Sequence, residues 1–288
     1  MKFRAIITNY VNMRELIDIL TTFARINKFL VINIQPKKFI IQTETEVESG
    51  QCLWCEIDAT SREGFFSDYV MDGVDQSHNQ IFLTVTAISL VQALSYIRGN
   101  AVEYLKIKLA KATIACLAIE ISGTCHIETD VVRPKVQHEV PVTVVPRSEW
   151  SNFELPLEMM YDLSMLLPSF KSLKGLIDKK KNISPAITVY CTLAGEFSLV
   201  VETSVVTVAS HYKGLECARA RTTDANSGDI REAACKVDSK KLANLLESIH
   251  FYDMKMFANI KNDQLLNIMF EMKDGVFLNL VLPAVDFE

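Results

Sequence analysis

The sequence predicts an α+β protein built from two pseudo-repeated domains, each with two helices covering one side of antiparallel sheets. The order of strand, helix and β runs from Phe3 to about Val145 recurs from about Tyr161 to Val285. The 288 residues, of which 49% are hydrophobic, can fill two medium-sized cores. Residues 146–158 contain two prolines and several polar side chains, which favours a link over an extension of either half. We therefore expect domains at 1–145 and 159–288, joined by an interdomain connector at 146–158.

The first half opens with a strand and an amphipathic helix. Residues 3–7 are apolar at alternate positions, which is typical of a half-buried strand. Residues 12–28 place apolar side chains at three- and four-residue steps, and Asn12 can cap the helix that this spacing predicts. The other elements expected in this half are a hairpin of 30–34 and 39–43 around Pro36-Lys37, a strand at 51–57, a helix at 87–98 that follows a strand, and β runs at 102–109, 114–121 and 136–145.

The second half repeats this order. Residues 161–165 correspond to the first strand, and 168–181 to the first helix, with Pro168 tolerated in a first helical turn. The later elements expected here are a hairpin of 186–193 and 197–203 around Ala194-Gly195, a strand at 205–212, a helix at 239–249 that follows a strand, and β runs at 254–260, 265–272 and 276–285.

Composition excludes several classes of protein. No apolar run approaches the roughly 20 residues of a membrane span, and the charged start Met1–Arg4 does not fit a secretory signal. Seven scattered cysteines favour reduced thiols in a cytosolic or nuclear protein. A net charge of −5 argues against a protein that coats nucleic acid generally.

The predicted helices carry basic residues opposite their apolar sides. A solvated helix face is usually charged, so any single lysine has an ordinary explanation. Recurrence on all four helices, however, favours a wall that holds a polyanion by phosphate charge without reading sequence. Lys179–Lys181 can be an import signal, although a charge cluster at a helix end is the more ordinary interpretation. The candidate polyanion-facing residues are Arg14, Arg25, Lys28, Arg98, Lys171, Lys174, Lys181, Lys240 and Lys241.

The sequence contains few residues in the patterns of catalytic or metal-binding motifs. Cys52 and Cys55 have the spacing of half a zinc knuckle, but no second pair follows, and residues three apart on a strand face opposite sides. No phosphate-binding glycine loop or HExxH helix is present. Glu128 and Asp130 alone are too few acids for a metal-dependent nuclease, which we keep as the alternative from another class. We expect no enzyme activity, metal or cofactor.

Several segments together resemble the sliding clamps of the eukaryotic replication type and, more closely, the Hus (hydroxyurea-sensitive) subunit family of the heterotrimeric nine-one-one checkpoint clamp. The similarity covers nearly the whole chain, and 122–137 and 217–229 depart from it as polar loops. The segments that carry it are Met1–Ala5, Leu53–Ile57, Phe65-Phe66, Met71–Val74, His138–Val142, Val145–Arg147 with Trp150, Leu173-Lys174, Lys181–Ser184, Gly195–Leu199, Glu202-Thr203 and Leu282–Val285.

The resemblance implies a nuclear scaffold, also cytoplasmic before assembly, that forms a ring with two other clamp subunits around double-stranded DNA. The helices, with the basic residues above, would line the hole, and the sheets would lie outside. A checkpoint clamp loader, repair enzymes and kinase-activating factors are the further partners it implies, with no membrane. A homotrimeric replication clamp is the alternative within this class.

Two kinds of contact surface follow from the resemblance. Such rings close when an edge strand of one subunit pairs with an edge strand of the next, and 136–145 and 205–212 are the expected edges. The aromatic residues of the connector either cover a client groove or merely pin the connector to a sheet. The candidate edge residues are Val140, Val142, Val144, Val205, Thr207 and Ala209, and the candidate groove residues are Trp150, Phe153, Leu155, Leu280, Val281 and Pro283.

Overall fold

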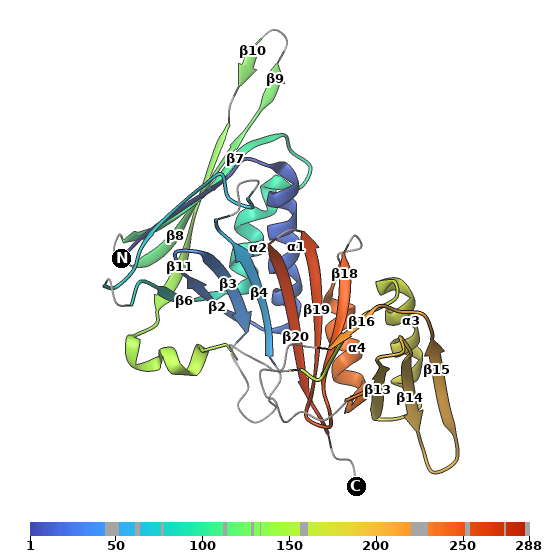
Figure 1. Cartoon of the computed structure of the whole chain (residues 1–288). Helices are drawn as coiled ribbons and strands as arrows, with labels where there is room; N and C mark the ends of the chain where they lie inside the picture. The colour runs from blue at the N-terminus through green and yellow to red at the C-terminus, as the bar shows by residue number, and fades with distance from the viewer. Residues whose placement is uncertain are drawn as a thin grey trace. The chain divides into compact units, whose positions relative to one another are not determined.

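The computed structural model describes residues 1–288 except 44–51, 61–63, 76–77, 112–113, 128–129, 133, 156–160, 220–229, 251–253, 274 and 286–288. The chain divides into two compact units. Unit 1 contains Met1–Glu44 and Trp54–Phe153, and unit 2 contains Thr45–Leu53 and Glu154–Glu288. Figure 1 shows both units, with helices and strands labelled. Among the described residues, no helix is both long and apolar enough to span a bilayer.

Unit 1 combines two helices that pack against each other with a strongly curved run of antiparallel strands (Figure 1). Its strands are hydrogen-bonded in the order β4-β3-β2-β6-β11-β8-β7-β1-β5. Its elements are β1 Lys2–Ile7, α1 Tyr10–Ile26, β2 Phe29–Ile34, β3 Lys38–Thr43, β4 Cys52–Asp58 (of which the first two residues are assigned to unit 2), β5 Asp68–Asp72, β6 Ile81–Thr86, α2 Ala87–Leu94, the 3-10 turn η1 Ser95–Ile97, β7 Val102–Lys111, β8 Ala115–Gly123, β11 Lys135–Val144 and the 3-10 segment η2 Arg147–Phe153.

Helix α1 forms where the apolar spacing predicts it, but it begins earlier than expected. Asn9 is the N-cap, and its side chain accepts a hydrogen bond from the Val11 amide at 2.8 Å. Asn12 is not the cap: it lies buried within the helix and donates to the Phe65 carbonyl at 3.1 Å. Met13, Leu16 and other buried residues form the stripe that faces the sheet.

Unit 2 has a second helix pair and two antiparallel sheets. The strand orders are β16-β12-β18-β19-β20 and β15-β14-β13-β17. Its elements are β12 Leu163–Leu166, α3 Phe170–Lys180, β13 Ala186–Thr192, β14 Phe197–Glu202, β15 Thr207–Tyr212, β16 Cys217–Arg219, β17 Glu232–Asp238, α4 Ser239–Ser248, β18 Lys255–Lys261, β19 Leu265–Lys273 and β20 Val276–Pro283. Ser169 occupies the N-cap position of α3, so Pro168 precedes the helix instead of lying in its first turn.

Four short strands were not predicted. They are β5 in unit 1, the β9–β10 hairpin (Cys125–Ile127 and Asp130–Val132) and β16 in unit 2. The hairpin falls within 122–137 and β16 within 217–229, both of which we expected to be loops. The other predicted β runs and all four predicted helices are present, with boundaries shifted by a few residues. The predicted α+β repeat is therefore confirmed at the level of its main elements.

Candidate functional site

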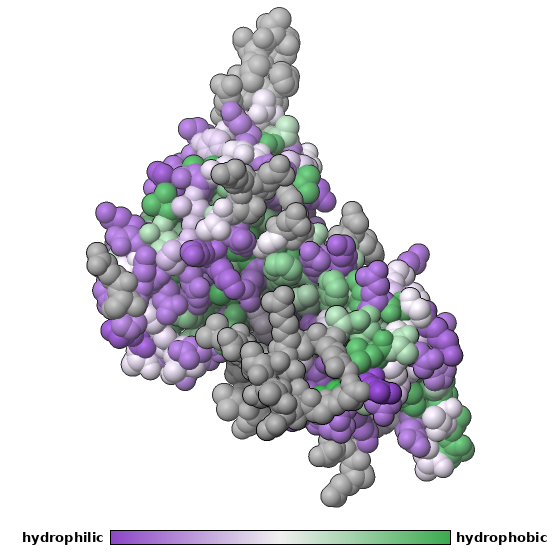
Figure 2. All heavy atoms as spheres, viewed as in Figure 1, coloured by the Kyte–Doolittle hydropathy of each residue, from purple (hydrophilic) through white to green (hydrophobic). Residues whose placement is uncertain are grey.

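Strand β15 is an open edge of the β15-β14-β13-β17 sheet. In the described part of the chain its only strand partner is β14. The predicted edge is thus present, and Thr207 and Ala209 lie in it. Val205 does not: it lies in the turn before the strand, where its side chain is 92% exposed. Figure 2 shows this apolar tip as a green area at the end of the β14–β15 hairpin.

The hydrogen-bond register identifies which backbone groups of β15 face outward. The Thr203 amide donates to the Val206 carbonyl at 3.0 Å, so these two residues form a hydrogen-bonded pair. Hydrogen-bonded pairs alternate along antiparallel strands, which turns the backbone groups of Val208 toward its partner Val201. The amides and carbonyls of Thr207, Ala209 and His211 therefore point away from the sheet and are available to another strand.

Strand β11 lies between β6 and β8 in the strand order, so it is an open edge over only part of the range predicted. Residues Lys135–Pro141 pair with β8, and Val142–Val144 pair with β6. The strand crosses from one neighbour to the other, so each part has one strand partner within the described residues. Of the predicted edge residues, Val140 and Val142 are buried, and Val144 is half-buried.

An open stretch nevertheless remains on the first part of β11. The Gly123 amide donates to the Pro134 carbonyl at 2.9 Å, which places the backbone groups of Val136, His138 and Val140 toward β8. The backbone amides and carbonyls of the alternate residues Lys135, Gln137 and Glu139 consequently point away from β8. They face the side of β11 on which β6 pairs with the later residues of the strand. Pro141 ends this open stretch because it has no amide to offer.

The predicted basic residues lie on or next to the helix pairs, and two of them form ion pairs with aspartates. Arg98 forms an ion pair with Asp18 at 3.1 Å, and Lys181 pairs with Asp178. Arg14, Arg25 and Lys28 are exposed along α1 and just after it, and Lys171, Lys240 and Lys241 are exposed in unit 2. Whether all four helices share one wall stays a prediction.

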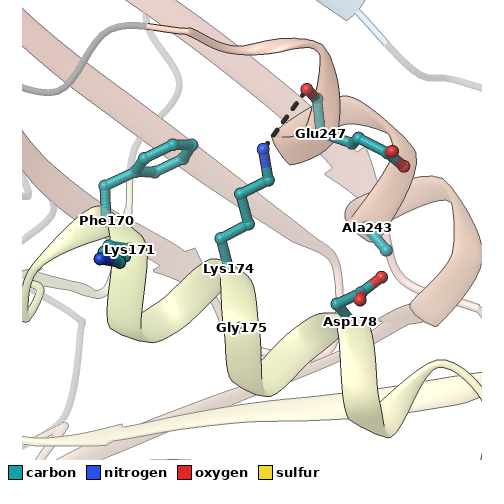
Figure 3. Close-up of a pocket in the computed structure, with 7 residues that line it drawn as sticks. All are labelled: Phe170, Lys171, Lys174, Gly175, Asp178, Ala243 and Glu247. Carbon is teal, nitrogen blue, oxygen red and sulfur yellow. Dashed lines mark hydrogen bonds between the residues drawn. The ribbon is translucent and has the colours of Figure 1, made fainter.

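A cavity of about 720 Å³ between α3 and α4 shows the mixed charge of this surface (Figure 3). Lys174 lies 5.7 Å from the Phe170 ring centre and donates to the Glu247 carbonyl at 3.5 Å. Asp178 and the Glu247 side chain line the same cavity. Two carboxylates beside two lysines leave the cavity with little net charge, so its attraction for a polyanion is weak.

Trp150 anchors η2, which lies at the start of the predicted connector, within unit 1. Its side chain is 6% exposed and packs with Val31, Val145 and Phe82, whose ring centre is 5.1 Å away. The indole Nε1 donates to the Val145 carbonyl at 3.1 Å. Of the two interpretations considered for this aromatic residue, the contacts favour the structural one.

The other groove residues are only partly accessible. Leu280 and Val281 are buried on β20, so neither exposes its side chain as an accessible groove residue would. Phe153, Leu155 and Pro283 are half-buried.

The described residues offer little catalytic chemistry. They contain no group of three or more His, Cys, Asp or Glu side chains able to hold a metal ion. Burial raises the pKa of the Cys55 thiol and raises that of Cys235 to about 12, so both remain protonated and poorly nucleophilic. Glu128 lies outside the described residues.

Solved structures with similar folds define the class of protein. PCNA from Thermococcus kodakaraensis matches with a TM-score of 0.69 and 13% identity, over 98% of this chain and 99% of that one. PCNA from Entamoeba histolytica matches with a TM-score of 0.65 and 12% identity, over 99% of both chains. The chain therefore has the sliding-clamp fold.

Sequence comparison then narrows the class to a family. The model of the family described as Hus1-like protein matches residues 1–286. Checkpoint protein Hus1-like of Drosophila melanogaster is 30% identical over 287 residues, which is 99% of each chain. Checkpoint protein HUS1 of Homo sapiens is 28% identical over 288 residues, covering 99% of this chain and 100% of that protein. The chain belongs to the Hus1-like family.

Proposed function

We propose that this chain is a non-catalytic subunit of a heterotrimeric checkpoint clamp that encircles double-stranded DNA at damage sites in the nucleus. The observation that carries the proposal is a pair of open strand edges, one in each unit, on a sliding-clamp fold of the Hus1-like family. A subunit with two separate edges can join two neighbours, as a closed ring of three requires.

Neighbouring subunits of the ring join by pairing their edge strands, and each such pairing is called a joint. Thr207, Ala209 and His211 of β15 offer outward backbone groups to one neighbour, and Lys135, Gln137 and Glu139 of β11 offer theirs to the other. Backbone hydrogen bonds supply the affinity of such a joint, and the side chains along it select the partner. We propose two different clamp subunits as these partners.

DNA binding in this proposal depends on charge and topology. The exposed Arg14, Arg25 and Lys28 supply positive charge, while the ion pairs of Arg98 and Lys181 keep the total small. A ring linked to a duplex needs only modest attraction, because strong phosphate binding would slow its movement along DNA.

Recruitment of other proteins completes the proposal: a checkpoint clamp loader, repair enzymes and kinase-activating factors. A structural relative supports peptide docking on this fold, since PCNA from A. fulgidus, which matches with a TM-score of 0.68, is bound to the C-terminal region of FEN-1. Phe153, Leu155 and Pro283 remain candidate contacts because each keeps part of its side chain exposed.

Light scattering of the full chain, alone and co-purified with its cellular partners, tests the proposal. We expect a 1:1:1 complex with two other proteins and no defined trimer of the chain alone. Ala209→Pro removes an outward amide of β15 without removing a bond to β14, so it should release one partner and leave the chain folded. Val205→Asn, in the exposed turn, is the matched control. A homotrimer of the lone chain, or retention of both partners by Ala209→Pro, would contradict the proposal.

A further inference from the structure

A lysine is buried at the C-terminal end of α3. The proposed ring closure and DNA binding do not explain why it is buried there. Lys180 is 3% exposed, whereas its neighbour Lys179 is exposed. The three consecutive lysines therefore do not form one exposed basic cluster. The Lys180 ammonium donates a hydrogen bond to the Val208 carbonyl of β15 at 2.8 Å. Burial lowers the pKa of Lys180, as expected where water is removed from a charged group.

The acceptor of this bond matters because β15 is an open edge. The Val208 carbonyl faces β14 in the register described above, and a carbonyl oxygen has two lone pairs. Lys180 can therefore hold the strand without occupying the outward groups of Thr207, Ala209 or His211. The strand is fixed and its open flank stays free.

Helix α3 and the segment that follows it contact the same hairpin at two further points. Ser172 Oγ lies 3.1 Å from the hydroxyl of Tyr212, at the far end of β15, and Ser184 Oγ donates to the Glu202 carbonyl of β14 at 3.1 Å. The spacing of the two β15 contacts fits a helix that runs beside the strand. From 172 to 180 a helix rises about 12 Å, and from 208 to 212 a strand advances about 13 Å.

We propose that Lys180 is a positioning residue that holds the edge strand β15 against α3 in the ordered form that a neighbouring subunit can join. A strand that pairs with only one other strand loses order easily. If it is disordered, part of the binding free energy of a neighbouring subunit is used to order it, so binding is weaker. The buried ammonium supplies part of that order beforehand. The part of this inference that concerns partner binding rests on the proposed function.

Hydrogen exchange of the full chain tests the inference without any partner. Lys180→Met keeps the length and apolar stem of the side chain and removes the donor. We expect the Val208 and Ser210 amides to exchange about tenfold faster, with β13 and β17 unchanged. Lys179→Met is the matched control and should leave exchange unchanged. Ser172→Ala, which releases the other end of β15, should accelerate exchange only near Tyr212.

Partner retention is then measured on complexes purified from cells that express each variant. We expect Lys180→Met to release the β15-side partner and Lys179→Met to retain it. Unchanged exchange in Lys180→Met would overturn the inference. Faster exchange throughout unit 2 would also overturn it, because Lys180 would then stabilise the whole unit and not β15 in particular. Faster exchange with undiminished partner retention would overturn it as well. If the wild-type chain captures no partner, the proposed function fails, while the exchange data still decide whether Lys180 orders β15.

Discussion

Replacement of Trp150 offers a quantitative test of how η2 is anchored within unit 1. Its ring is buried among Val31, Phe82 and Val145, with Phe153 packed against the same cluster. Truncating a buried tryptophan to alanine costs about 3–5 kcal/mol, and part of that loss here is the hydrogen bond from Nε1 to the Val145 carbonyl. Because this cluster is small, we expect Trp150→Ala to lower the free energy of unfolding of unit 1 by about 3 kcal/mol.

A second substitution separates packing from hydrogen bonding. Trp150→Phe keeps an aromatic ring against Phe82 and leaves the Val145 carbonyl without its indole donor. An unsatisfied buried acceptor costs about 1–3 kcal/mol, so this variant should lose less than Trp150→Ala. Asn152→Ala, at an exposed position of η2, is the control and should stay within about 0.5 kcal/mol of wild type.

The assay is urea unfolding followed by tryptophan fluorescence and by hydrogen exchange of β2 and β6. The chain has two tryptophans, so the Trp150 variants leave Trp54 as the remaining fluorophore. A loss below about 1 kcal/mol in Trp150→Ala would refute the anchoring argument. If that variant kept its stability but lost a client protein, the alternative interpretation of Trp150 as a groove cover would be correct.

Three further predictions concern other described contacts. Asn9→Ala removes the cap of α1 and should cost about 1 kcal/mol in thermal unfolding, whereas Asn9→Asp should retain most of it; equal losses would contradict the capping role. The Tyr104 hydroxyl donates a hydrogen bond to the Glu120 carboxylate at 2.6 Å and lowers the pKa of Glu120. The hydrogen bond should therefore stabilise the fold at pH values above the usual pKa of Glu. This stabilisation should disappear as the pH falls through the lowered pKa. Tyr104→Phe should therefore be less stable than wild type at neutral pH by less than about 1 kcal/mol and equal to it in acid, as measured by urea unfolding at both pH values; an equal difference in acid would refute this. If Arg25 contacts one phosphate, Arg25→Gln should reduce the slope of log binding constant against log salt concentration by about 0.9. Arg98→Gln should reduce this slope less, because Arg98 is already paired with Asp18. DNA-binding titrations at several salt concentrations compare the two variants.

Local periodicity was sufficient to predict the helices and the longer strands. The stripe of Met13, Leu16 and Leu20 identified α1, but Asn12 was predicted as its cap, whereas the cap is Asn9, three residues earlier. The first residue of the helix depends on where the chain leaves β1. The spacing of apolar residues within the helix does not indicate that point. Strand β5 was missed because Asp68–Asp72 lacks strong alternation and is stabilised by pairing with β1. Long-range pairing of this kind outweighs local preference.

Periodicity alone was not sufficient to predict the open strand edges. Alternation in β11 marked Val140 and Val142 as members of a strand, but it could not show that this strand crosses between β8 and β6. Which backbone groups remain open follows from the hydrogen-bond register alone. Pro141 was the one sequence signal available, because a proline in a strand marks a position where no amide is needed. The buried Lys180 had no such signal, since its neighbours are also lysines.

The two edges differ in how they are protected against unwanted pairing. The open stretch of β11 exposes Lys135 and Glu139 and ends at Pro141, and charges and prolines are the usual means of keeping an edge soluble. The outward positions of β15 are Thr207, Ala209 and His211, without a Lys, Arg, Asp or Glu, and the neighbouring turn exposes Val205. An edge with so little protection is a liability in a free chain, and in the proposed ring a neighbouring subunit would cover it. If the proposed ring forms, we expect the β15 joint to be the more stable of the two and the β11 joint to open more readily.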